Sequence, residues 1–112
     1  MLARALASAA ALVLLVLATS FGASADVPKP ATHTVVIDGV SFQPSVLAVK
    51  AGDTIVWVNK DPFPHTVTSK AGGFDSGEIS AGQSWKYTPK AKGEFAYVCT
   101  FHPTMKATLR VE

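Results

Sequence analysis

The fold is decided by one stretch near the end of the chain, Cys99-Thr100-Phe101-His102-Pro103-Thr104-Met105. This stretch places a thiol, an imidazole and a thioether at even intervals of three residues. A tight loop with this spacing brings the three side chains to one point. A second histidine, His65, lies upstream, just after a strand-like run, and the chain has no other cysteine than Cys99. These four side chains are therefore the candidate ligands of one metal ion.

The types of donor indicate which metal would bind. Two imidazole nitrogens, one thiolate sulfur and one distant thioether sulfur form the ligand set of blue-copper electron-transfer centres. Each residue alone has an ordinary explanation, because free cysteine is often a small buried hydrophobe and methionine often fills gaps in a core. Zinc also binds thiolate and imidazole, but a thioether is a poor zinc ligand. The joint spacing of Cys99, His102 and Met105 favours copper, whereas His33 has no such neighbours and is expected to be a solvated strand residue.

The start of the chain is typical of a secretory signal peptide. Arg4 carries a positive charge, an almost wholly apolar run follows, and Ala23-Ser24-Ala25 matches an A-x-A cleavage site. We expect cleavage of residues 1–25, which leaves residues 26–112 as a single small domain. The apolar run is shorter than the roughly 20 residues that a spanning helix needs, so we expect no membrane span after cleavage.

Charge and cysteine content narrow the possible functions. The formal net charge is +2, and the loss of Arg4 with the signal would leave +1. A nucleic-acid-binding domain usually carries a basic stripe, so we expect no nucleic-acid partner. A secreted domain of this size often needs disulfides or a metal, and one cysteine cannot form an internal disulfide. We expect no enzymatic activity, because four protein ligands would close the metal site to a substrate.

Short runs of β-branched and aromatic residues between glycine and proline turns predict an all-β fold. No segment after the signal shows convincing helical periodicity. Seven or eight short strands with such turns describe a β-sandwich. We expect strands at 32–38, 45–50, 54–59, 65–69, 83–88, 93–99 and 105–111, a link at 41–44 that turns Phe42 inward, and a long irregular stretch at 70–82.

Other residues are expected to support the ligands or to contact partners. Asn59 ends a strand before the His65 loop, where its amide could tie the two ligand loops together and its backbone N–H could donate to the Cys99 sulfur. Pro64 fixes the backbone beside His65, and Thr100 directly follows Cys99. Four side chains of the two loops would form an apolar patch at the metal end, namely Pro62, Phe63, Phe101 and Pro103.

With these motifs the chain resembles the cupredoxins, and among them most closely the amicyanins of the plastocyanin-like group. The resemblance covers residues 32–112 and implies a Greek-key β-sandwich with copper near one end. It implies His65, Cys99 and His102 as equatorial ligands and Met105 as the axial ligand. The short Cys-x-x-His-x-x-Met loop is the form that amicyanins carry. The matching residues are Asn59, Pro64-His65, Cys99-Thr100, His102-Pro103, Met105 and the strand Gly93-Glu94-Phe95-x-Tyr97-x-Cys99.

The resemblance also implies a function. Cupredoxins of this kind shuttle one electron through a type 1 copper site, in the periplasm or another exported location. We therefore expect a monomeric electron carrier that meets a dehydrogenase, a cytochrome or an oxidase by transient contact. Lys60, Lys70 and Lys106 would rim the apolar patch and steer an acidic partner.

Two other functions stay open at this point. A copper-handling protein, for binding, delivery or tolerance, would use the same site, and a structural sandwich would use no metal. Two residues also depart from the amicyanin pattern, because Phe101 stands where amicyanins typically have proline and Thr104 where they typically have phenylalanine. Both residues lie on the loop that would face a partner, so the departures bear on partner choice.

Overall fold

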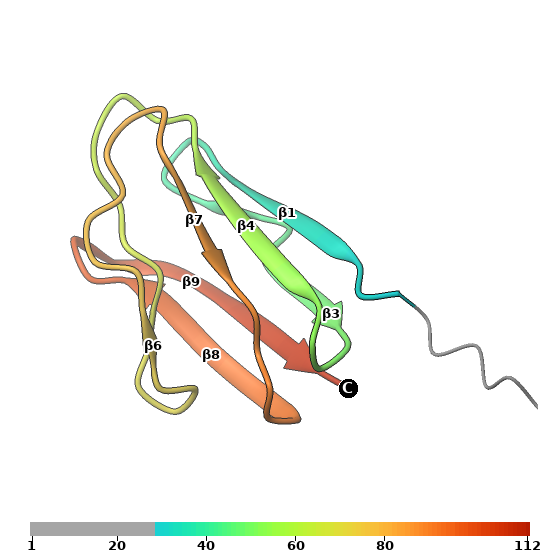
Figure 1. Cartoon of the computed structure of the whole chain (residues 1–112). Coiled ribbons are helices and arrows are strands. Elements are labelled where there is room, and N and C mark those ends of the chain that lie inside the picture. Colours follow the sequence, from blue (N-terminus) through green and yellow to red (C-terminus); the bar gives the residue numbers. More distant parts are fainter. Residues whose placement is uncertain (1–28) are drawn as a thin grey trace, which may run out of the picture.

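The computed structural model describes residues 29–112, and the expected signal peptide at residues 1–25 lies outside this range. The described residues form nine strands in two sheets that lie face to face (Figure 1). The predicted all-β sandwich is confirmed. Among the described residues, no helix has the length and apolar character that crossing a bilayer requires.

The first sheet has four strands in the order β2-β1-β4-β7. At its centre β1 and β4 run parallel, in register from the pair Thr32–Thr54 to the pair Ile37–Asn59. Strands β2 and β7 pair antiparallel with the outer edges of β1 and β4. The bounds are Thr32–Ile37 for β1, Phe42–Gln43 for β2, Thr54–Asn59 for β4 and Ser84–Tyr87 for β7.

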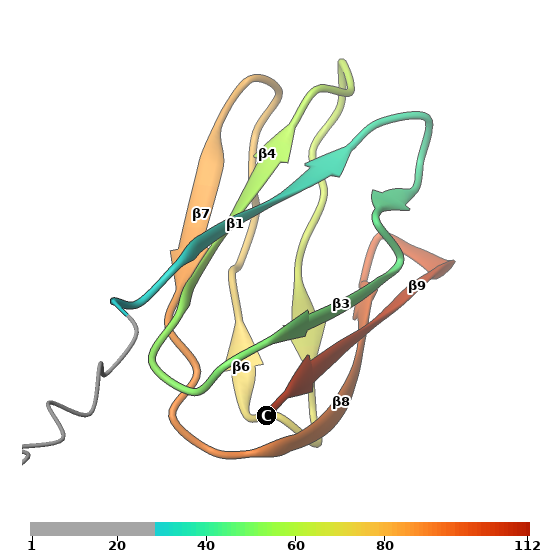
Figure 2. The same ribbon diagram turned by 90° about the vertical axis from the view of Figure 1, so that its right-hand side faces the viewer.

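The second sheet has five strands in the order β3-β9-β8-β5-β6. Strands β8 and β9 form a long antiparallel hairpin, whose turn lies at one end of the sandwich, away from the C-terminus (Figure 2). Strand β3 runs parallel to β9 on its other side. The bounds are Val46–Val49 for β3, Thr68–Ser69 for β5, Phe74–Asp75 for β6, Gly93–Cys99 for β8 and His102–Val111 for β9.

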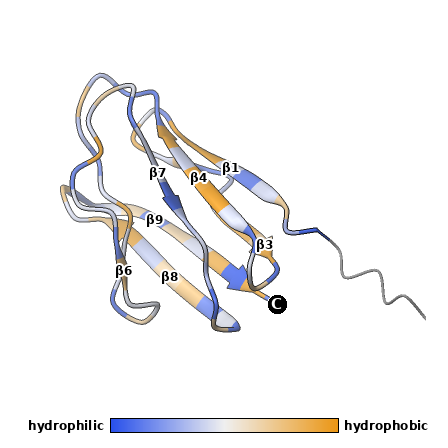
Figure 3. Cartoon of the chain, viewed as in Figure 1, coloured by the Kyte–Doolittle hydropathy of each residue, from blue (hydrophilic) through white to orange (hydrophobic). Residues whose placement is uncertain are grey.

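The core fills the space between the two sheets. In β4 the alternation of side chains buries Ile55, Trp57 and Asn59 and leaves the residues between them half-buried. Figure 3 shows strongly hydrophobic residues along β4 and hydrophilic ones in the edge strand β7. Trp57 Nε1 donates a hydrogen bond to the Tyr97 hydroxyl at 3.3 Å, and burial raises the pKa of Tyr97 to about 12. The centre of the sandwich is therefore apolar with its few polar atoms paired.

Three parts of the chain are more regular than the sequence indicated. Strand β2 forms within the expected link, β6 forms within the expected irregular stretch, and β9 begins at His102 rather than at residue 105. The described part of the chain therefore has nine strands where the sequence predicted seven or eight. The expected strand at 65–69 is shorter, because only β5 is regular and His65 forms an isolated bridge with Ile79. Strands β2 and β6 each pair with the preceding strand over only two residues, which is too short to show a period in the sequence.

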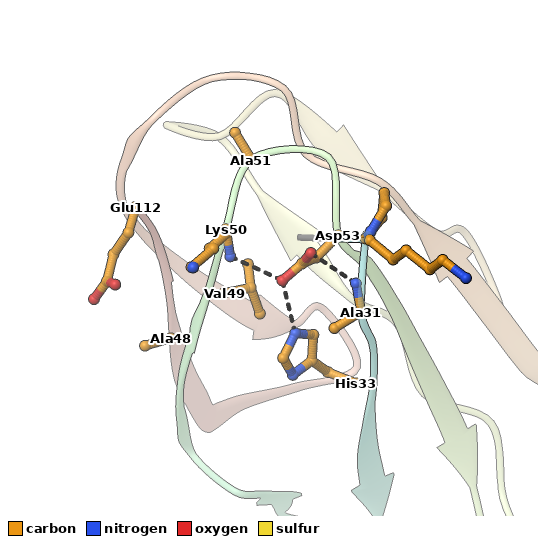
Figure 4. Close-up of a pocket in the computed structure, with 10 residues that line it drawn as sticks. Ala31, His33, Ala48, Val49, Lys50, Ala51, Asp53 and Glu112 are labelled. Atoms are coloured by element: carbon orange, nitrogen blue, oxygen red, sulfur yellow. Dashed lines mark hydrogen bonds and ion pairs between the residues drawn. The ribbon is translucent and has the colours of Figure 1, made fainter. Parts of the chain in front are cut away.

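The end of the sandwich opposite the β8–β9 turn has a surface pocket of about 550 Å³. Figure 4 shows the charged group in it, where the Asp53 carboxylate accepts bonds from the backbone N–H groups of Ala31 and Lys50 and from His33 Nε2. The expectation that His33 is a solvated residue is therefore corrected. Its side chain is 26% exposed, and its Nε2 lies 2.9 Å from Asp53 Oδ2.

Candidate metal centre

Strand β8 delivers Cys99 to the interior. Along this strand Tyr97 and Cys99 are buried and Phe95 is half-buried, which decides between the two faces that the sequence left open. The register shifts between Val98 and Cys99, and Cys99 then pairs with His102, the first residue of β9. The hairpin turn therefore places the thiol and one imidazole side by side.

His65, Cys99 and His102 come together at this end of the sandwich. One possible ligand atom of each lies within 4.8 Å of the others. Cys99 Sγ is 3.6 Å from His65 Nδ1 and 3.8 Å from His102 Nδ1. Both rings therefore present Nδ1 to the same sulfur, from two loops that are far apart in the sequence.

A metal ion fits between these three donors. With bonds of about 2.0 Å to nitrogen and about 2.3 Å to sulfur, as zinc makes, a trigonal angle places nitrogen and sulfur roughly 3.7 Å apart. The two observed nitrogen–sulfur separations, 3.6 Å and 3.8 Å, match this value. One thiolate and two imidazoles in a trigonal set, with a weak fourth donor, are typical of type 1 copper.

Met105 lies at the metal end of the core. It is the first of the inward residues on β9, followed by Ala107 and Leu109, and it is 3% exposed. It stands three residues after His102, just before Lys106, where the regular pairing of β9 with β8 resumes after the register shift. This burial suits a packing role and an axial ligand equally, so the axial role of Met105 stays a prediction.

His65 is held by a carboxylate that the sequence analysis did not single out. The His65 side chain is fully buried, and its Nε2 lies 2.7 Å from Asp61 Oδ2. Burial alone would raise the pKa of Asp61, but hydrogen bonds from the Val40 N–H, the His65 ring and the Gly39 N–H together lower it. The carboxyl group is therefore ionised at neutral pH. Its one sign in the sequence is an acidic residue four positions before the ligand.

The Cys99 sulfur accepts a hydrogen bond from the Thr66 N–H at 3.3 Å. This corrects the expectation that the Asn59 N–H is the donor, because that group instead binds the Gln83 carbonyl at 2.9 Å. Thr66 directly follows His65, so one loop supplies a ligand and the hydrogen bond to the sulfur. Hydrogen bonds to a thiolate ligand tune the reduction potential of the metal.

The side chain of Asn59 supports the His65 loop from inside. Its Nδ2 donates to the carbonyls of Phe63 and Ile79, both at 2.9 Å, and its Oδ1 accepts from the Asp61 N–H at 3.0 Å. Asp61 and Phe63 lie in the loop that follows β4, and Ile79 forms the isolated β-bridge with His65 of that loop. Asn59 therefore braces one ligand loop, rather than tying the two ligand loops together as expected.

The tie between the two ligand loops is made by Thr66 and Thr100. The Thr100 N–H donates to Thr66 Oγ1 at 2.9 Å, and the two hydroxyl oxygens are 3.1 Å apart. Thr66 was not singled out in the sequence, because its role depends on a contact across 34 positions. Thr100 follows Cys99, so this contact fixes the position of the sulfur relative to the His65 loop.

Apolar side chains lie exposed around the partly buried His102. Phe63 is 41% exposed and Phe101 is 51% exposed. The Phe63 ring lies 6.0 Å from the His102 ring and 5.5 Å from the His65 ring, between centroids. Pro62 and Pro103 are exposed as well, whereas Pro64 is half-buried beside His65.

Comparisons with known proteins agree with this fold and site. Residues 8–111 match the family model of the cupredoxin-like domain, and the chain therefore belongs to the cupredoxin-like family. Amicyanin from Paracoccus versutus is 34% identical over 95 residues, which cover 80% of this chain and 71% of that protein. Amicyanin-alpha from Methylorubrum extorquens is 32% identical over 119 residues, which cover 97% of this chain and 99% of that protein.

The fold also matches that of a solved structure. The copper(I) form of an amicyanin mutant matches with a TM-score of 0.67 and 28% sequence identity, over 72% of this chain and 82% of that one. Family membership and the site of His65, Cys99 and His102 together identify the metal as one type 1 copper ion.

Proposed function

We propose that this chain is a blue-copper electron carrier that passes single electrons between redox proteins outside the cytoplasm. The observation that carries the proposal is the convergence of His65 Nδ1, Cys99 Sγ and His102 Nδ1 within a cupredoxin fold. A copper ion bound by these atoms supplies the one-electron Cu(II)/Cu(I) couple. The similarity to amicyanins and plastocyanins supports the carrier function.

The residues of the chain keep the site dry and fixed. Cys99 and His65 are fully buried, and Met105 is almost so. The hydrogen bond from the Thr66 N–H to the sulfur and the one from the His65 ring to Asp61 restrict how far the metal ligands can move. A site whose donors are held in this way needs little rearrangement when the metal changes charge, which favours fast electron exchange.

His102 is the route by which we expect electrons to enter and leave. It is the partly exposed member of the ligand set, whereas His65 is sealed inside. The exposed rings of Phe63 and Phe101 flank it, with Pro62 and Pro103 beside them. A small apolar surface of this kind suits the low-area, transient contacts of redox encounters. The exposed Lys60, Lys70 and Lys106 would steer an acidic partner toward it.

The location follows from the start of the chain. The signal peptide expected at residues 1–25 would direct the protein to the periplasm or another exported location. The similarity to amicyanins supports this location. A dehydrogenase, a cytochrome or an oxidase in the same compartment would be the partner, and the carrier would act as a monomer.

The function is tested by cycling the copper-loaded protein between its two oxidation states in the presence of a copper(I) chelator. A small reductant and a small oxidant are added in turn while the visible absorbance is followed. An electron carrier is expected to bleach and recover over many cycles with its copper retained. Transfer of the copper to the chelator after the first reduction would contradict the proposal and indicate copper handling.

A further inference from the structure

Asp61 is a buried carboxylate beside the copper centre. It lies two residues beyond the end of β4, and its side chain is 4% exposed. The Gly39 N–H donates to its Oδ1 at 2.7 Å. The Val40 N–H and the His65 Nε2–H donate to its Oδ2 at 2.9 Å and 2.7 Å. Burying a charge is costly unless hydrogen bonds compensate it, and here three donors do so.

The contact with Asp61 determines which nitrogen of His65 faces the metal. Both oxygens of the Asp61 carboxylate accept backbone N–H bonds, Oδ1 from Gly39 and Oδ2 from Val40, so Oδ2 meets the His65 ring as an acceptor too. His65 Nε2 must therefore carry the proton, and Nδ1 presents its lone pair on the side of Cys99 Sγ, 3.6 Å away. Metal-binding histidines commonly donate their second ring N–H to a carboxylate, which fixes both the tautomer and the orientation of the ring.

Asp61 is itself held from two sides. Its backbone N–H donates to Asn59 Oδ1 at 3.0 Å. Its carboxylate lies against the turn between β1 and β2, where Gly39 and Val40 have φ angles of 61° and 56°. Successive N–H groups in such a turn form a concave anion-binding nest. A positive φ is unfavourable for a β-branched valine, so the contacts with Asp61 help to hold this turn in place.

We propose that Asp61 is the positioning residue of the copper centre. It holds the His65 ring with Nδ1 toward the metal, it anchors that ring to the turn of Gly39 and Val40, and its buried negative charge favours Cu(II) over Cu(I). The last effect follows from Coulomb's law, because a fixed anion stabilises the more positive state of a nearby ion. The proposal rests on the copper function proposed above.

The chain contains a matched control for Asp61, which is Asp53 at the other end of the parallel strands β1 and β4. Asp53 precedes β4 and accepts bonds from the Ala31 and Lys50 N–H groups and from His33 Nε2, at 2.9, 3.0 and 2.9 Å (Figure 4). The two carboxylates therefore have the same chemistry, with two backbone donors and one imidazole each. Eight residues of extended chain separate them by roughly 25 Å, so Asp53 lies far from the copper ligands.

The test compares Asp61→Asn with Asp53→Asn. Asparagine has the same shape as aspartate but replaces one oxygen by an NH₂ group, which meets the same N–H donors. In Asp61→Asn we expect the affinity for Cu(II), measured by competition with a chelator, to fall about 10- to 100-fold. We also expect its reduction potential to rise. Asp53→Asn should lower the unfolding free energy but leave copper affinity and potential at the wild-type values.

Two results would overturn the proposal. One is an Asp61→Asn protein with the wild-type affinity and potential. The other is an equal change in both variants, because a general loss of stability would then explain it. If Asp61→Asn does not fold, NMR of the ring nitrogens of His65 in the metal-free wild-type protein decides the question. In the neutral ring, a proton on Nε2 with a bare Nδ1 supports the proposal, and a proton on Nδ1 with a bare Nε2 overturns it.

Failure of the proposed function would look different from failure of this inference. In that case the wild-type protein itself would lack reversible copper reduction, whatever the variants do. If the wild-type protein cycles normally and only the comparison of Asp61 with Asp53 fails, the carrier function stands and the positioning role of Asp61 does not.

Discussion

At the scale of single residues, the copper centre combines one thiol with two imidazoles that differ in their exposure to solvent. Cys99 and His65 are sealed in the core, whereas His102 reaches the surface at the hairpin turn. The Thr66 N–H adds a hydrogen bond to the sulfur from the loop that carries His65. The site therefore has one fixed, dry side and one side open to partners, as electron exchange requires.

The axial role of Met105 can be tested by Met105→Gln. An amide oxygen is a harder donor than a thioether, so it favours Cu(II), and we expect a lower reduction potential with the intense colour retained. A redox titration followed by absorbance measures both. The control is Leu109→Met on the same inward face of β9, which should leave the potential unchanged.

An unchanged potential in Met105→Gln would mean that Met105 only packs the core. Stability gives a second readout of the same question. Burying an amide without a partner costs about 1–3 kcal/mol of unfolding free energy. If the amide binds copper, this cost should be smaller in the copper-loaded protein than in the metal-free protein.

The spacing of Cys99 and His102 predicted two of the three donors that the structure brings together, and His65 is the third. The axial role of Met105, predicted from the same spacing, stays a prediction.

The residues that support the ligands, Asp61 and Thr66, could not be predicted from a spacing of this kind. Thr66 acts through hydrogen bonds to positions 33 and 34 residues away, and such contacts leave no local pattern. Asp61 contacts His65 across only four residues, but a single acidic residue at that distance does not stand out, and the N–H groups that hold Asp61 lie 21 and 22 residues away. Asn59 was expected to tie the two ligand loops together and to donate to the Cys99 sulfur, but its N–H groups bind the carbonyls of Phe63, Ile79 and Gln83 instead.

At the scale of elements, β4 connects the two charged ends of the first sheet. Asp53 precedes the strand and Asp61 follows it, and each carboxylate binds backbone N–H groups at the corresponding end of β1. The parallel pair of β1 and β4 is thus fixed at both ends by a carboxylate. One end supports a copper ligand, and the other end is structural.

The hydrogen bonds of Asp53 at the structural end of β4 predict how the free energy of unfolding depends on pH. The hydrogen bond from His33, with those from the Lys50 and Ala31 N–H groups, lowers the pKa of Asp53 from 3.8 to about 2. A carboxyl group whose pKa is lower in the folded state stabilises the fold above its unfolded pKa. This stabilisation is lost as the pH falls through the folded value. Asp53 therefore stabilises the protein above about pH 4, and the effect disappears between about pH 4 and pH 2.

Urea unfolding of the wild type and of Asp53→Asn across this pH range measures the effect. We expect the wild type to be more stable at pH 5 to 7, with a difference that shrinks as the pH falls toward 2. A difference that stays constant from pH 7 to pH 2 would show that Asp53 acts only through its shape and not through its charge. Metal-free protein is used, so that copper binding does not contribute.

The strands that the sequence predicted best are those with the strongest β composition. The predicted ranges 54–59 and 93–99 have the same bounds as β4 and β8. Gly52, in the turn before β4, has a φ of 93°, a conformation that glycine adopts readily. The early start of β9 was missed, because Pro103 argues against a strand at this position, whereas the pairing of His102 with Cys99 extends β9 to it.

At the scale of the whole molecule, the sandwich and the metal should stabilise each other. The ligands come from the β8–β9 hairpin of the second sheet and from the loop that links β4 of the first sheet to β5 of the second. A copper ion bound to both segments stabilises the folded state alone.

Removal of copper is therefore expected to lower the melting temperature. At a free copper concentration of about 1,000 times the dissociation constant, binding contributes about 4 kcal/mol. For a domain of this size the corresponding shift is roughly 15–30 °C. Calorimetry of the metal-free and copper-loaded proteins measures it. Equal melting temperatures would contradict a metal site that joins the two sheets.

The most direct test of the type 1 copper centre is the visible absorption spectrum of the protein during titration with Cu(II), for the wild type and for Cys99→Ser. For the wild type we expect an intense blue band that saturates at one copper per chain and bleaches reversibly with a mild reductant. The Cys99→Ser protein should lack this band, because the thiolate–copper bond produces it. A colourless wild type, or a Cys99→Ser protein that stays intensely blue, would contradict the account.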